Sequence, residues 1–262
     1  KSLGNAINPL DLIDKYGVDP VRYYLMREMV LGQDASFTMD SFIKRYNSDL
    51  ANDLGNLVGR VTTLIGRYFR GTIPDRGQLG ELEHKMLKRA KQLPEVVLEN
   101  ISLMKLSDAI EEIMQFVRAI NRYMEQRKPW KLVKNNVEKA GTILFIVVES
   151  LRNALLLLHP IMPVRTEKIF QMMGLDLETA RKPLIAGQLL GEFEIPFPRI
   201  ESPEKEKKIV FVKEKSMSEE KDKKKKEGEH DQAPRLRNHR AQSRRPQGSP
   251  TQERLRALYP RQ

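Results

Sequence analysis

The longest regular hydrophobic pattern in the sequence lies between Phe42 and Phe69. Apolar side chains recur there every three or four residues, with polar residues between them. This spacing places the apolar positions along one side of an α-helix. The pattern therefore predicts one amphipathic helix of about eight turns, and Gly71 and Pro74 mark its end.

Two short helices are predicted before this segment and four helices after it. Asn8-Pro9 and Asp19-Pro20 are start signals, because a capping side chain precedes a proline at the first helical position. Pro94 predicts a kink within the first of the later helices. The later segments are Leu82–Asn100, Leu106–Met124, Ala140–Leu158 and Val164–Met173. Since residues 38–175 show no convincing strand alternation, the sequence predicts a mainly α fold, an antiparallel helix bundle.

Composition narrows the class of protein. The chain contains no cysteine, which excludes a disulfide, a thiolate metal site and a thiol nucleophile, and which fits a cytoplasmic protein. The most apolar run is interrupted by Glu149, Arg152 and Asn153. We therefore expect a buried helix there and not a membrane span.

The positive charge is concentrated near the end of the chain. Of the formal net charge of +11, residues 231–262 contribute +6, residues 201–230 contribute +1 and residues 1–200 contribute +4. Residues 201–230 predict a charged linker, and the Arg-rich residues 231–262 predict a disordered tail. The abrupt loss of lysine in that tail fits either one encoded protein or a reading-frame shift. Residues 1–200 are only mildly basic, so any nucleic-acid binding by this globular part must depend on local geometry and not on overall charge.

Three residues of the globular part have side chains suited to contact RNA bases. Asn56 and Arg60 are four residues apart and project from the same side of the long helix. An amide can read a base edge, and a guanidinium can hydrogen-bond to a base or stack on it. Trp130 is the only tryptophan in the chain and follows Pro129, so it could form a stacking platform. The spacing alone equally fits a solvated helix face and a core tryptophan.

Two sequence segments resemble class I aminoacyl-tRNA synthetases in general, and two others resemble the methionyl-tRNA synthetase family within that class. The opening "KSLGNAINPLDLIDKYGVDPVRYYLM" is similar to the second half of the "KMSKS" loop and its continuation. "NSDLANDLGNLVGR" (47–60) and "RKPW" (127–130) resemble the methionyl versions of the first anticodon helix and of a later loop. "LLLHPIMPVRTEKIFQMMG" (156–174) is shared by several class I enzymes. The resemblance covers residues 1 to about 198 and implies this division: residues 1–36 as the edge of the catalytic domain and residues 37–200 as the anticodon-binding bundle.

The resemblance implies a methionine–tRNA ligase that uses ATP and Mg²⁺. Lys1 and Ser2 match the last two letters of the ATP loop. The family's "HIGH" signature is not found around any of the four histidines. The chain is therefore expected to be a C-terminal part of a longer cytoplasmic enzyme. By itself it should be a monomer that binds no cofactor or metal and does not aminoacylate.

The resemblance also implies a role in reading the CAU anticodon of the methionine tRNA. Asn56, Arg60 and Trp130 match the family's anticodon readers, and Trp130 would stack on the first base. Residues that could contact phosphates, or could be ordinary surface charge, are Arg127, Lys128, Lys131 and Lys134.

Three other interpretations stay open on the sequence. The bundle could be a tRNA-binding module without catalysis, or the anticodon-binding part of a leucyl, valyl, isoleucyl or cysteinyl enzyme. It could also be a structural helical scaffold whose Lys-rich segment binds an acidic partner.

Overall fold

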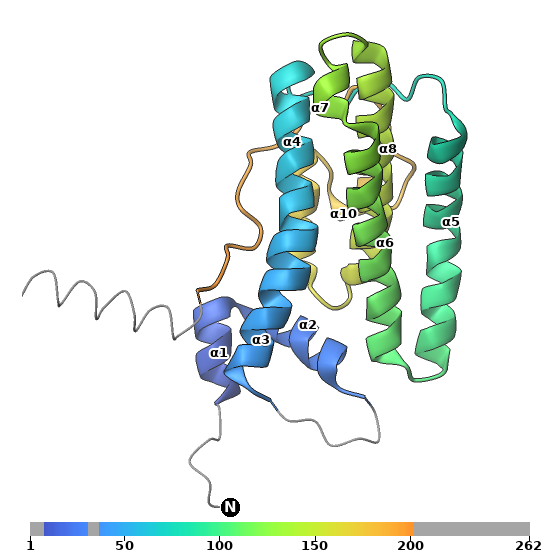
Figure 1. The fold of residues 1–262 in the computed structure, drawn as a ribbon. Helices are drawn as coiled ribbons and strands as arrows, with labels where there is room; N and C mark the ends of the chain where they lie inside the picture. Colours follow the sequence, from blue (N-terminus) through green and yellow to red (C-terminus); the bar gives the residue numbers. More distant parts are fainter. Residues whose placement is uncertain (1–7, 31–36, 202–262) are drawn as a thin grey trace, which may run out of the picture. The chain divides into compact units, whose positions relative to one another are not determined.

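The computed structural model describes residues 8–30 and 37–201 and is helical throughout its regular parts (Figure 1). All of these residues belong to the first of two compact units, Lys1–Glu206 and Lys207–Gln262. Lys1 and Ser2, the predicted linker beyond Glu201 and the tail lie outside the described residues. The elements are α1 (Pro9–Tyr16), α2 (Val18–Glu28), α3 (Met39–Arg45), the π-helix η1 (Tyr46–Gly55), α4 (Asn56–Tyr68), α5 (Glu81–Ser102), α6 (Leu106–Arg127), α7 (Pro129–Leu132), α8 (Val137–Leu158), α9 (Pro163–Met172) and α10 (Leu177–Ala180).

The predicted helix bundle is confirmed. Helices α5, α6 and α8 pack against one another, and α4 packs against α8. Figure 1 shows the long helices side by side, with successive connections at opposite ends of the bundle. Helix α8 is long and apolar enough to cross a membrane, but 78% of its most apolar window is buried in the bundle. It is the core helix that the sequence predicts.

The two predicted start signals behave differently. The side chain of Asn8 accepts a hydrogen bond from the Leu10 N–H at 3.1 Å, so it caps α1 as expected. The prediction for Asp19 is wrong, because α2 already begins at Val18 and Asp19 lies inside it. The buried Asp19 carboxylate instead accepts from the Arg165 N–H at 2.6 Å. This hydrogen bond joins α2 to the start of α9.

The prediction of one continuous α-helix between Phe42 and Phe69 is also wrong in its middle. The ten residues of η1 form a π-helix, and the N–H of Asn56 donates to the carbonyl of Ala51, five residues earlier. The segment is bound to its surroundings by a buried polar contact, since the Tyr23 hydroxyl donates to Asp49 Oδ2 at 2.8 Å. π-Helical turns are rare and often occur at functional sites.

An extended segment after α10 was not predicted as an ordered element. We call residues 191–200 the strap; Figure 1 shows it in orange alongside α4. At its start the Gly191 N–H donates to the carbonyl of Met172 at 3.2 Å. At its end Ile200 and Asn47 exchange two hydrogen bonds, of 2.9 Å and 2.7 Å. Both ends of the strap are therefore fixed to the bundle.

Candidate nucleic-acid interface

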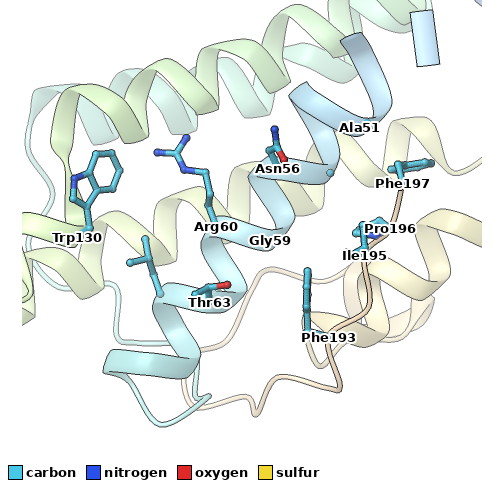
Figure 2. A pocket seen from close by; sticks show the side chains of 12 residues that line it. Ala51, Asn56, Gly59, Arg60, Thr63, Trp130, Phe193, Ile195, Pro196 and Phe197 are labelled. Carbon is cyan, nitrogen blue, oxygen red and sulfur yellow. The ribbon is translucent and has the colours of Figure 1, made fainter. Parts of the chain in front are cut away.

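An open groove of about 600 Å³ runs over the exposed face of α4. Helix η1 and α4 form its floor, α7 contributes one wall and the strap contributes the other (Figure 2). We call it the α4 groove, and its lining residues are Ala51, Gly55, Asn56, Gly59, Arg60, Thr63, Leu64, Trp130, Phe193, Ile195, Pro196 and Phe197. The structure thus brings Asn56, Arg60 and Trp130, which the sequence singled out, to one surface.

Asn56 and Arg60 project from the same side of α4. Asn56 is the first residue of α4 and is exposed. Arg60 donates from Nη2 to Glu125 Oε1 at 2.6 Å. Its guanidinium carbon also lies 5.1 Å from the centre of the Trp130 ring. A cation at this distance is within the range of a cation–π interaction, so Arg60 links α4 to both α6 and α7.

Trp130 is presented by a tight turn between α6 and α8. Lys128 ends α6 in the left-handed region, with φ of 50°, and the next residue, the buried Pro129, begins the single turn of α7. Trp130 is half-buried, because it packs against the core while it lines the groove. Trp130 therefore fits both interpretations: part of its indole packs against the core, and part is available in the groove as a stacking platform.

The four candidate phosphate contacts occupy different environments. Lys128, Lys131 and Lys134 are exposed. Arg127, in contrast, donates to the buried Glu83 at 2.6 Å. That ion pair engages Arg127 within the bundle, so the three lysines are the stronger candidates for contact with a phosphate.

Glu83 is held by several donors. Its Oε1 also accepts from the Tyr123 hydroxyl at 2.7 Å, and its Oε2 accepts from the Gly80 N–H at 3.0 Å. Burial acts to raise the pKa of Glu83, but the hydrogen bonds from Tyr123 and Arg127 and the charge of Arg127 lower it overall. The cluster fixes the end of α6, and with it the turn that carries Trp130.

Sequence reasoning missed the strap side of the groove and Glu125. Phe193 and Ile195 are 46% and 65% exposed, yet both line the groove. The alternation of apolar residues in "FEIPF" (193–197) was a signal for an ordered segment. Among residues 8–30 and 37–201, no three carboxylates or histidines gather in a way that could hold a metal ion.

Two family models match this sequence. One, described as class I tRNA synthetases (M), matches residues 1–62, and the other, the anticodon-binding domain of tRNA ligase, matches residues 83–238. The second match covers more than half of the chain, so the chain belongs to the tRNA ligases that carry this anticodon-binding domain. Within that family, its sequence and fold are similar to those of methionyl-tRNA synthetases, as the resemblance predicted.

Curated relatives and a solved structure show this similarity. The methionine–tRNA ligase of Clostridium acetobutylicum is 38% identical over 224 residues, which are 83% of this chain and 35% of the relative. The ligase of Caldanaerobacter subterraneus is 39% identical over 209 residues, or 77% of this chain and 33% of the relative. The crystal structure of Mycobacterium tuberculosis methionyl-tRNA synthetase bound by methionyl-adenylate has a TM-score of 0.72 at 31% identity, covering 76% of this chain and 41% of that one. The chain spans about a third of the length of these curated relatives.

Proposed function

We propose that this chain is the anticodon-binding part of a methionine–tRNA ligase and that the α4 groove receives the CAU anticodon. The observation that carries this proposal is the meeting of Asn56, Arg60 and Trp130 in one open groove. The whole protein would join methionine to its tRNA with ATP and Mg²⁺. Lys1 and Ser2 would serve in its ATP loop, and the protein would act in the cytoplasm.

The groove offers three kinds of contact to a single-stranded loop. The exposed part of Trp130 can stack on the first anticodon base, and stacking of this kind contributes about 1–3 kcal/mol per base. Asn56 can donate to and accept from a base edge. The lysines at 128, 131 and 134 can meet phosphates, which position the loop without reading its sequence.

Arg60 can change partners when RNA binds. Its present partner Glu125 is 59% exposed, and an exposed ion pair of this type stabilises a protein by only about 0–1 kcal/mol. The guanidinium can therefore leave Glu125 and hydrogen-bond to a base at small cost.

The proposal is tested by titrating the chain with a short RNA stem-loop that carries CAU, and with matched loops altered at one anticodon position. We expect Trp130→Ala, Asn56→Ala and Arg60→Ala each to weaken CAU binding by about tenfold or more. Arg122→Ala is the matched control, because Arg122 is an exposed residue of α6 that does not line the groove. The proposal would be overturned in favour of a general electrostatic role by an affinity that is the same for all loops and all three variants but is lost in high salt.

Two further expectations concern the chain alone. No "HIGH" signature occurs in its sequence, so we expect it not to charge tRNA when methionine and ATP are supplied. We also expect it to be a monomer, which size-exclusion chromatography with light scattering measures directly.

A further inference from the structure

The strap carries an aromatic side chain that the proposed anticodon site does not yet use. Phe193 is 46% exposed although both ends of the strap are fixed by hydrogen bonds to the bundle. Four residues later, Phe197 is buried and packs edge-on against Tyr46, with 6.2 Å between the ring centres. The strap thus buries one phenyl ring and leaves the other at the surface of the groove.

Phe193 lies close to the glycine at position 59. A Cβ atom on residue 59 would lie 3.4 Å from Cζ of the Phe193 ring. The ring therefore lies close to the backbone of α4, next to the residue that reaches Trp130. Figure 2 shows Phe193 on the strap side of Gly59, while Arg60 extends toward Trp130. The exposed face of α4, with Asn56 on it, is flanked by one aromatic side chain from each wall.

From this arrangement we infer that Phe193 is a second stacking platform, which holds the third base of the anticodon while Trp130 holds the first. The inference rests on the proposed function, since it assigns a ligand to the other wall of the same groove. An unstacked base is the ligand that this wall fits. A phenyl ring offers no hydrogen bond, and Ile195 and Pro196 beside it are apolar, so the side chains of this wall can cover the face of a base but cannot read its edge.

With this assignment, different residues of the groove supply base discrimination and affinity. Discrimination between bases falls to Asn56 and Arg60, whose side chains can hydrogen-bond. Phe193 supplies affinity that is independent of the identity of the third base. Removing its ring should weaken an intact CAU loop and a loop with a different third base by the same factor.

The test pairs two protein variants with two altered stem-loops. Each loop has an abasic site at either the first or the third anticodon position, so that one stacking partner is absent. Phe193→Ala should weaken binding of the intact CAU loop about tenfold and should have no further effect on the loop without a third base. Trp130→Ala should weaken binding of the intact loop but should have no further effect on the loop without a first base. Phe193→Tyr should restore binding, while Phe193→Leu, which keeps apolar volume without a ring, should not.

The controls separate a stacking role from a packing role. Ile185→Ala removes another exposed apolar side chain, outside the groove and before the strap, and should leave affinity unchanged. Thermal unfolding of each variant identifies loss of fold. The inference is overturned if Phe193→Ala binds as the native chain does, or if it weakens all three loops equally. Failure of the proposed function would look different, because Trp130→Ala would then also leave CAU binding unchanged.

Discussion

The guanidinium of Arg60 lies over the indole of Trp130, with 5.1 Å between Cζ and the ring centre, although 70 residues separate them in the chain. The contact joins α4 to α7 across the α4 groove. It also holds the indole in place before RNA arrives, so that less conformational freedom is lost on binding.

Trp130 should report binding by its own fluorescence. It is the only tryptophan among 262 residues, so all indole emission comes from the groove. We expect a CAU stem-loop to quench the emission in proportion to occupancy, because a base stacks on the exposed part of the ring. A loop that is abasic at the first anticodon position should bind with little quenching. Saturable binding of the intact loop without any change in emission would contradict the stacking of a base on Trp130.

Arg60→Lys should weaken CAU binding although it preserves the charge. Lysine lacks the planar group that stacks on Trp130 and that can donate two hydrogen bonds to a base. We expect a loss of about tenfold, which corresponds to about 1.4 kcal/mol, with an unchanged dependence on salt. Isothermal titration at several salt concentrations measures both quantities. Native affinity in this variant would show that Arg60 acts only as a positive charge.

Lys131→Ala should change binding in a different way. Lys131 is exposed beside Trp130 and is a candidate for contact with phosphate. Its removal should weaken binding of the CAU loop and of the altered loops by the same factor. It should also reduce the slope of log affinity against log salt concentration by about 0.7, the value for one phosphate contact to a single strand. A loss restricted to one anticodon sequence would indicate a base contact instead.

Two glycines of α4 provide a matched pair. A Cβ atom added at Gly66 would meet no neighbouring group within 4 Å, whereas a Cβ at Gly59 would touch Phe193 at ordinary contact distance. Both Gly66→Ala and Gly59→Ala should stabilise the helix by about 0.5–1 kcal/mol, measured by denaturant unfolding. Gly59→Leu should block the groove and abolish RNA binding, while Gly66→Leu should bind normally. Equal binding by the two leucine variants would exclude the groove as the RNA site.

Glu83→Gln should destabilise the chain in a manner that depends on pH. The folded pKa of Glu83 lies below its ordinary value of 4.5. The unfolded state therefore binds the proton more readily, and Glu83 contributes stability above pH 4.5 that is lost as the pH falls through the folded pKa. At pH 7 we expect the variant to lose about 2 kcal/mol of unfolding free energy, because Tyr123 and Arg127 lose a charged acceptor. The difference from the native chain should shrink in acid, and a constant difference down to about pH 3 would contradict this account.

The sequence predicted the helices and one side of the groove, but not the contacts between distant segments. Helical spacing was sufficient to place Asn56 and Arg60 on one face. Only the family resemblance connected them with Trp130, because hydrophobic periodicity contains no information on which loop reaches which helix. Phe193 was missed for the same reason, since its neighbour Gly59 lies 134 residues earlier. The engagement of Arg127 by Glu83 was also hidden, because a glutamate in a polar-looking helix gives no sign that it is buried.

The π-helix η1 has a consequence for the direction in which the groove faces. A turn closed by a hydrogen bond from Asn56 to Ala51 contains one residue more than an α-helical turn. Each residue of an α-helix advances the side chains by about 100° around the axis. Had η1 instead been an α-helix, its ten residues would turn further around the axis, and Asn56 and Arg60 would face a different direction from the one that meets Trp130. η1 therefore sets the direction around the helix axis in which the side chains of α4 point. An insertion or deletion of one residue between Tyr46 and Gly55 would turn Asn56 and Arg60 away from the groove even where the helix itself survived.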